Sequence, residues 1–291
     1  VIAPGFIDVH THAENVESNP AAKSFLRMGV TTLVLGNCGS SRLDLGAYFK
    51  KLEQKGFSPN VCSLIGHGTV RRQAMGRSFM RPPNAKEMAA MKMHIDQAMR
   101  DGAVGMSTGL IYIPGVFAKT DELVELSKVV SAHGGLYVSH MRAEGLEIFD
   151  AVDEVCRIAR EAKLPAHISH LKLNTKPMWG KNKKLLARLD LARTEGIRLT
   201  HDQYAYTASS TGLRQLLPDE SRAEGRDHFK KLIADPAERK KISDWMKGRL
   251  KARNRDSYSY AVIANYKHDK SYNGLNIVEA AKKRFGDASL D

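Results

Sequence analysis

Short apolar runs alternate with longer amphipathic segments along most of the chain. Seven of the runs have the length and composition of buried strands, and Gly or Pro residues bound them. They cover residues 5–12, 31–38, 60–67, 103–110, 135–141, 165–171 and 197–204. A strand followed by a helix, repeated in this way, predicts an α/β fold in which a parallel sheet closes into a TIM-like (β/α)8 barrel.

The segments between the runs carry the signals that begin and end helices. Asn84 and Glu87 have the spacing of a capping box, and Gly102 follows that helix as a stop signal. An open, doubly wound sheet is the alternative, but no GxGxxG motif follows the first predicted strand. The barrel is therefore the favoured architecture.

The pattern changes after Tyr206. We interpret residues 1–208 as the barrel core and 209–291 as a mostly helical insertion or lid that precedes a missing last strand. The chain starts at Val1 without a Met and ends directly at Asp291, so we read it as a barrel truncated at both ends and a piece of a longer protein.

The composition excludes some functions. The chain has 291 residues, of which 42% are hydrophobic, but no apolar run is long enough for a membrane span, and no signal peptide is visible. The net charge of +13 comes largely from residues 176–188 and 230–251, at a helical spacing that indicates a solvated face. We therefore expect no nucleic-acid partner. Three cysteines without a CxxC pair favour a reducing compartment, which we expect to be the cytoplasm.

Histidines gather at the predicted strand ends. Six of the 11 lie there, namely His10, His12, His67, His140, His170 and His201. Active sites of barrels form at the carboxyl ends of the strands, so these imidazoles are expected to meet at one mouth. His10 and His12 are two residues apart and share a face of their strand, with Asp8 beneath them. Two neutral imidazoles on one face can hold a metal, although a hydrogen-bonded surface pair is the alternative.

Residues 4–12, PGFIDVHTH, resemble the opening of the amidohydrolase superfamily, and residues 36–39, GNCG, resemble its D-aminoacylase branch of N-acyl-D-amino-acid deacylases. Blocks that include Ser107-Thr108-Gly109 and His140-Met141-Arg142 are also similar to that branch. The resemblance implies one or two zinc ions, held by His10, His12, Cys38, His170 and His201. His167 has the opposite parity to His170 and is left out, and Cys62 and Cys156 are assigned to the core.

The same resemblance implies zinc-dependent hydrolysis of an amide bond outside peptides, in a small-molecule N-acyl-D-amino acid. His67 and Arg142 are candidates for substrate binding. The general-base aspartate is expected beyond Asp291, so this stretch alone is expected to be inactive. Two alternatives stay open: a cyclic amidohydrolase like dihydroorotase or hydantoinase, and a non-catalytic metal-binding or nucleic-acid-associated module. The sequence does not indicate an oligomeric state.

Overall fold

Seven parallel strands form a single sheet. The computed structural model describes residues 2–288 and divides into two compact units, 1–174 with 180–205, and 175–179 with 206–291. The sheet of the first unit has the strand order β1 to β7 in sequence order, and every adjacent pair is parallel. Its strands are β1 (Phe6–Asp8), β2 (Val30–Leu35), β3 (Asn60–Gly66), β4 (Gly105–Gly109), β5 (Leu136–His140), β6 (Ala166–Ile168) and β7 (Leu199–His201).

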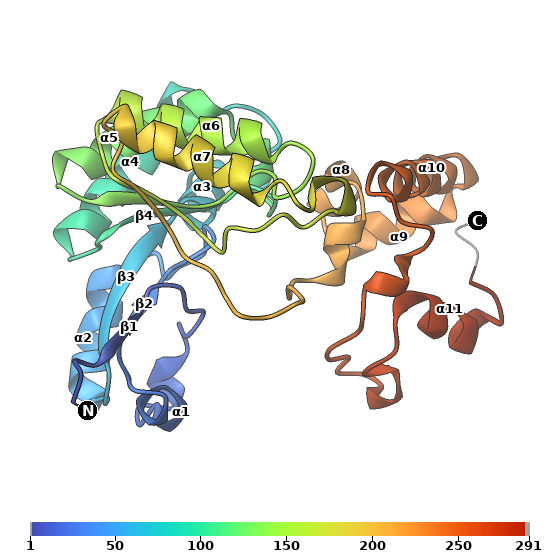
Figure 1. The fold of residues 1–291 in the computed structure, drawn as a ribbon, viewed down its shortest axis with the longest axis horizontal. Helices are drawn as coiled ribbons and strands as arrows, with labels where there is room; N and C mark the ends of the chain where they lie inside the picture. Colours follow the sequence, from blue (N-terminus) through green and yellow to red (C-terminus); the bar gives the residue numbers. More distant parts are fainter. Residues whose placement is uncertain (1, 289–291) are drawn as a thin grey trace. The chain divides into compact units, whose positions relative to one another are not determined.

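Helices connect consecutive strands. They are α1 (Lys23–Arg27), α2 (Leu45–Lys55), α3 (His67–Met75), α4 (Ala85–Arg100), α5 (Thr120–Ala132), α6 (Ile148–Ala162) and α7 (Asn182–Thr194), with short 3-10 turns η1 (Val16–Ser18) and η2 (Gly115–Phe117). Helices α4 to α7 lie along one face of the sheet, each against the strands next to it (Figure 1). The predicted barrel-type α/β fold is confirmed by this strand order and by these crossovers.

Local sequence explains where the helices begin and which face they bury. The predicted capping box of α4 is present, because Asn84 and Glu87 each accept a hydrogen bond from the backbone N–H of the other. Helix α6 buries Ile148, Val152 and Val155, whose three- and four-residue spacing places them on one stripe. These contacts fix the helix layer that supports the strand ends.

The sheet is strongly curled. The first and last strands are six positions apart, so in a flat sheet with a spacing of about 4.8 Å they would lie roughly 29 Å from each other. Yet His10 Nδ1, just after β1, lies 3.3 Å from Asp202 Oδ2, just after β7. Only curvature brings these two ends together, and it places the ends of all seven strands around a common mouth.

Several strands are shorter than predicted. Strand β1 ends at Asp8, so the prediction that His10 and His12 lie within the strand is wrong. The chain beyond β1 still follows β2, because Thr11 N–H and Thr11 Oγ1 both donate to Val34 O, at 3.2 and 2.8 Å. The strand ladder stops, but the segment stays anchored beside its neighbour.

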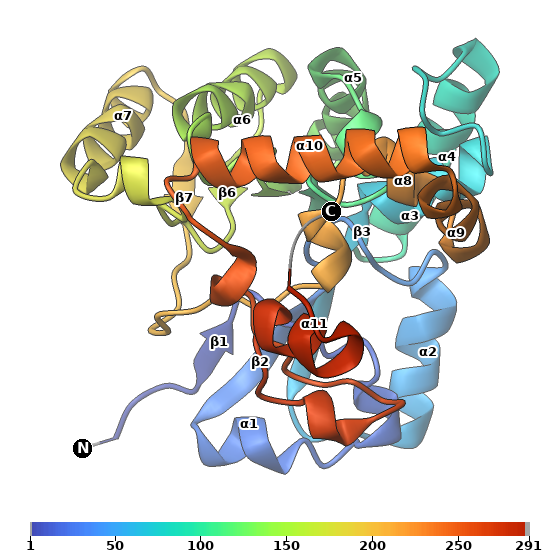
Figure 2. The same cartoon turned by 90° about the vertical axis from the view of Figure 1, so that its right-hand side faces the viewer.

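The second unit is mostly helical. It contains α8 (Asp219–Ala223), α9 (Arg226–Ala234), α10 (Pro236–Ala252) and α11 (Ile277–Phe285), with 3-10 turns η3 (Lys176–Met178), η4 (Leu213–Leu216), η5 (Tyr258–Tyr260) and η6 (Lys270–Tyr272) (Figure 2). Asp235 caps α10 by accepting from the backbone N–H groups of Ala237 and Glu238, and Pro236 occupies the first turn. The interpretation of this region as an insertion or lid stays a prediction. Across residues 2–288, none of the helices has the length and apolar character that crossing a bilayer requires.

Candidate metal centre

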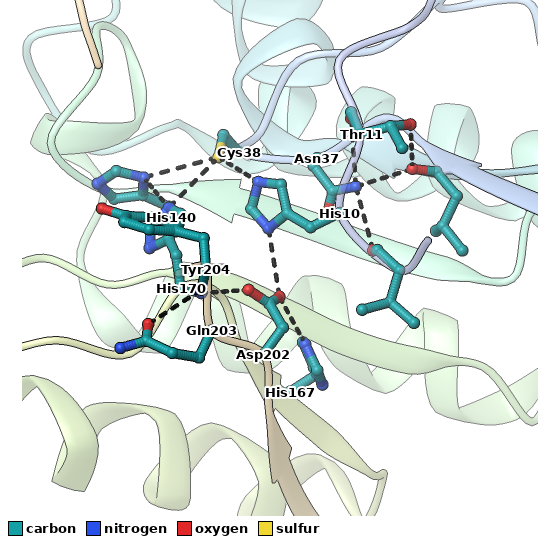
Figure 3. Close-up of polar contacts among 12 residues, drawn as sticks. His10, Thr11, Asn37, Cys38, His140, His167, His170, Asp202, Gln203 and Tyr204 are labelled. Carbon is teal, nitrogen blue, oxygen red and sulfur yellow. Dashed lines mark hydrogen bonds and ion pairs between the residues drawn. The ribbon is translucent and has the colours of Figure 1, made fainter. Parts of the chain in front are cut away.

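The segment after β1 carries His10 and His12 to the mouth of the sheet. Asn37 Nδ2 donates to Val34 O at 3.0 Å and lies 3.5 Å from both Val9 O and Thr11 O. The buried amide therefore links the His10–His12 segment to the end of β2 (Figure 3). The two histidine rings lie 5.4 Å apart, with His12 exposed and His10 partly buried.

A tight turn after β2 presents Cys38. Gly36, Cys38 and Gly39 all have positive φ angles, of 76°, 54° and 76°. For Cys38 this left-handed conformation is uncommon and needs support from its surroundings. Ser107 on β4 provides it, since its buried hydroxyl donates to Gly36 O and accepts from Gly39 N–H. The turn is thus held from both sides of the cysteine.

Three imidazole nitrogens surround the Cys38 sulfur. Sγ lies 3.5 Å from His10 Nε2, 3.6 Å from His140 Nδ1 and 3.9 Å from His170 Nε2 (Figure 3). His140 Nδ1 and His170 Nε2 are only 2.9 Å apart. The potential ligand atoms fall into two groups that share the sulfur: His10, His12 and Cys38, and Cys38, His140 and His170.

This donor set fits a thiophilic divalent cation. Tetrahedral zinc has Zn–S and Zn–N bonds of about 2.3 and 2.1 Å, which place a sulfur and a nitrogen ligand about 3.6 Å apart. The three observed Sγ–nitrogen separations, 3.5 to 3.9 Å, scatter around that value. Soft sulfur combined with imidazole is a donor set that suits zinc and not magnesium or calcium.

Two carboxylates lie behind the histidines, on the side away from the sulfur. Asp202 Oδ2 is 3.3 Å from His10 Nδ1 and 2.9 Å from His167 Nε2, and Asp202 Oδ1 accepts from the backbone N–H of His170 at 2.6 Å. Glu144 Oε1 lies 2.9 Å from His170 Nδ1. Both acids therefore contact the imidazole nitrogen that does not face Cys38.

The electrostatics keep these groups in defined protonation states. Burial would raise the pKa of Glu144, but the hydrogen bond from His170 and the nearby His140 and Lys172 lower it to about 2. For Asp202, too, burial opposes ionisation, and the hydrogen bonds from His10 and His167 lower its pKa overall. Burial lowers the pKa of His140 to about 3, so its ring is neutral and able to bind a metal near pH 7.

The protein alone does not favour a thiolate at Cys38. Burial, followed by the negative charges of Glu144 and Asp202, raises the pKa of the thiol to about 12. A bound divalent cation reverses this balance, because a coordinating thiol loses its proton. Cys38 is therefore suited to a metal and not to acting as a free nucleophile at neutral pH.

Known proteins with a similar sequence make the family clear. No family model matches the chain. A D-aminoacylase of Alcaligenes xylosoxydans xylosoxydans is 36% identical over 243 residues, which cover 74% of this chain and 49% of the relative. The chain belongs to the D-aminoacylase branch of the amidohydrolases. It spans about half the length of the curated relatives that it matches.

Solved D-aminoacylases share the fold. The crystal structure of a D-aminoacylase that defines a novel subset of amidohydrolases has a TM-score of 0.76 and 29% identity, covering 98% of this chain and 57% of its own. An N-acyl-D-glutamate deacylase of Bordetella bronchiseptica, complexed with zinc and a phosphonate inhibitor, has a TM-score of 0.67 and 35% identity over 70% of this chain and 48% of its own. The predicted D-aminoacylase resemblance is thus confirmed.

Four of the five predicted ligands of this D-aminoacylase-like site come together, and one does not. His10, His12, Cys38 and His170 belong to the two donor groups, whereas His201 belongs to neither. Burial, followed by the positive charge of Arg193 on α7, lowers the pKa of His201. The alternation of β7 turns Thr200 and Asp202, not His201, toward His167. Asp202, and not the predicted ligand His201, therefore faces the histidines of the site.

The two predicted substrate-binding residues have other partners. His67 is fully buried at the start of α3, where its Nε2 lies 2.8 Å from Glu122 Oε1. Arg142 makes a two-pronged ion pair with Glu154 and donates to Val116 O and Ala118 O. Its guanidinium thus holds η2 and Ala118 against α6, which leaves little capacity for a substrate carboxylate.

Three residues near the metal donors lack an assigned role in the sequence-based prediction. The sequence places His140 at a strand end without a role, and it indicates no role for Glu144 or Asp202. For His140 the signal was available, because it closes a buried strand as the other histidines do. For the two acids the sequence carries no such signal. Asp202 is far in the sequence from its partner His10, and Glu144 lies in a loop apart from its partner His170.

Proposed function

We propose that the protein is a zinc-dependent hydrolase that removes the acyl group from N-acyl-D-amino acids. The single observation that carries the proposal is the Cys38 sulfur with three imidazole nitrogens within 3.9 Å, in a chain that belongs to the D-aminoacylases. The zinc-bound structure of an N-acyl-D-glutamate deacylase supports the choice of metal.

Cys38, His140 and His170 would hold one ion, and His10 and His12 would complete a second group around the same sulfur. Zinc bound there supplies a water with a pKa near 7 and polarises an amide carbonyl. His140 contributes as a neutral ligand, because its buried ring resists protonation. His201 belongs to neither donor group, and only the family resemblance supports its proposed role as a zinc ligand.

The two acids beside the histidines serve to hold them. Asp202 contacts His10, His167 and the backbone of His170, and Glu144 contacts His170 and Lys172. Both carboxylates are therefore occupied by these contacts, and neither is available as a general base for water. The proposal keeps the expectation that the proton-accepting aspartate lies beyond Asp291.

The substrate class follows from the relatives and not from the described side chains. Two of the relatives are named D-aminoacylase and N-acyl-D-glutamate deacylase, so we propose a small N-acyl-D-amino acid as substrate.

The test measures metal content and hydrolysis together. Elemental analysis should give one or two zinc ions per chain, and the protein should release free amino acid from N-acetyl-D-methionine faster than from the L-isomer. A chelator should stop the release, and added zinc should restore it. Variant His170→Asn should lose zinc, while His228→Asn, in the exposed ion pair with Glu224, should not. Protein without zinc, or release that ignores the chelator, would contradict the proposal.

A further inference from the structure

A carboxylate fixes the orientation of His170. His170 has a left-handed backbone, with φ of 39°, and its N–H is bound by Asp202 at 2.6 Å. Its ring then has two unlike sides. Nδ1 lies 2.9 Å from Glu144 Oε1, and Nε2 faces the Cys38 sulfur and His140. We propose that Glu144 is a positioning residue, which keeps the proton of His170 on Nδ1 and thereby leaves the Nε2 lone pair free for the metal.

The surroundings of Glu144 suit this role. The residue is 8% exposed, and its other oxygen lies 3.4 Å from Asn174 Nδ2, while Asn174 N–H donates to Glu144 O at 2.9 Å. Both the side chain and the backbone of Glu144 are thus fixed by one neighbour. A carboxylate accepts hydrogen bonds and cannot donate one when ionised, so the proton between it and His170 must come from Nδ1.

Histidines that bind metals are commonly held in this way by an acceptor at the other nitrogen, which sets the tautomer and the ring orientation. Here the pattern appears twice, because Asp202 contacts Nδ1 of His10 while Nε2 of His10 faces Cys38. Two histidines, which follow β1 and β6, therefore present the same nitrogen to the same sulfur. The inference rests on the proposed metal site, and it adds the residue that prepares His170 for it.

Lys172 offers a competing explanation. Its Nζ lies 3.0 Å from His170 Nδ1 and also contacts Glu144 Oε1. If Lys172 donated a hydrogen bond to Nδ1, that nitrogen would carry no proton, and the proton of the neutral imidazole would lie on Nε2, the nitrogen that faces Cys38. An Nε2–H cannot bind a metal. Lys172 and Glu144 thus predict opposite tautomers for His170, and substitution can tell them apart.

The experiment reads the tautomer and the metal affinity separately. Long-range ¹H–¹⁵N spectra of metal-free, ¹⁵N-histidine-labelled protein report which nitrogen carries the proton, with His170 assigned through His170→Asn. Zinc affinity is measured by competition with a chromophoric chelator and expressed per folded protein. In the wild type we expect the proton on Nδ1. In Glu144→Gln we expect a mixed tautomer and zinc binding weaker by about 10- to 100-fold.

Three further variants sharpen the result. Glu144→Asp keeps the charge but is one methylene shorter, so it should lose less affinity than Glu144→Gln, and it serves in its place if that variant does not fold. Glu122→Gln is the matched control, because Glu122 is equally buried and bonded to His67 but has no contact with the Cys38 group. Its zinc affinity should match the wild type. Lys172→Met should leave the proton of His170 on Nδ1.

The possible failures are distinct. An unchanged tautomer in Glu144→Gln with zinc affinity within about twofold of the wild type would overturn the role of Glu144 and leave the hydrolase proposal intact. A wild type with the His170 proton on Nε2, moving to Nδ1 in Lys172→Met, would show that Lys172 and not Glu144 sets the tautomer. A wild type that binds no zinc would refute the proposed function, while its spectra would still decide between Glu144 and Lys172.

Discussion

Cys38 is the side chain shared by both groups of metal donors. We expect Cys38→Ser to lower the zinc content of the purified protein, because a hydroxyl is a far poorer zinc ligand than a thiolate. Cys156→Ser is a fitting control, since that cysteine is buried in α6. Elemental analysis of both variants checks the prediction. Unchanged zinc in Cys38→Ser would return this cysteine to a packing role.

Tyr137 predicts how stability depends on pH in alkaline solution. The ring is fully buried, its OH lies 2.8 Å from Thr108 Oγ1, and burial raises its pKa to about 12. Above a pH of about 10, the unfolded chain loses this proton and the folded protein keeps it. The contribution of Tyr137 to stability is therefore complete below pH 10 and falls by roughly 1.4 kcal/mol per pH unit as the pH rises toward 12.

Variant Tyr137→Phe isolates this effect. At pH 8 it should be less stable than the wild type by about 1–2 kcal/mol, because a buried hydrogen bond is lost. The difference should shrink between pH 10 and 11, since only the wild type carries the titrating group. Urea unfolding at both pH values measures it. A difference that stays constant with pH would show that the Tyr137 hydroxyl ionises alike in the folded and unfolded chains.

The sequence predicted the chemistry of this site better than its geometry. His10, Cys38 and His170 could be identified because residue type and position at the end of an apolar run are both visible in the sequence. The orientation of His201 and Asp202 could not be predicted, because it depends on where β7 ends. A shift of the strand by one residue turns every side chain to the opposite face of the sheet. The role of Glu144 depends on a loop that no periodic pattern describes.

Among the elements, the end of β3 packs against the Cys38 turn in addition to the hydrogen bonds from Ser107 of β4. A Cβ on Gly66 would lie 2.6 Å from Gly39 C and O and 2.7 Å from Ser40 N, all of them backbone atoms that cannot rotate away. Gly66→Ala should therefore displace the turn. We expect a loss of roughly 1–3 kcal/mol in unfolding free energy together with weaker zinc binding. Thermal or urea unfolding and chelator competition give the two values.

Gly248 in α10 provides the comparison, because nothing lies within 4 Å of a Cβ built there. Gly248→Ala should stabilise the helix by about 0.5–1 kcal/mol and leave zinc affinity unchanged. If Gly66→Ala bound zinc as tightly as the wild type, close packing of β3 on the turn would not be what positions Cys38.

The elements themselves were largely accessible to prediction. The seven strands occur in the predicted order, and the capping box at Asn84 begins α4 as expected, since both depend on local patterns. Strand ends were less accessible. Residues 9–12 continue the apolar and polar alternation of β1, but after Asp8 only Thr11 keeps backbone hydrogen bonding with β2, and no local signal marks that change.

At the scale of the molecule, the candidate ligands tie distant parts of the first unit together. His10 and Cys38 follow β1 and β2, whereas His140 ends β5 and His170 follows β6. In the absence of a cation, these four strand ends are connected at the mouth by weak contacts between imidazoles and a thiol. A metal would replace them with strong bonds across the open side of a curled sheet, so binding and folding of this unit should be linked.

Removal of the metal should accordingly destabilise the protein. A ligand present at 1,000 times its dissociation constant stabilises the folded state by about 4 kcal/mol. For a domain of this size, that corresponds to a melting temperature lower by about 10 °C after chelation.

The effect should be confined to the first unit, because all the donors precede residue 206. Hydrogen exchange should therefore increase at the ends of β1, β2, β5 and β6 and stay unchanged in α9 and α10. In Cys38→Ser the chelator should have little effect on melting, and a similar loss in the two proteins would mean that the metal binds elsewhere.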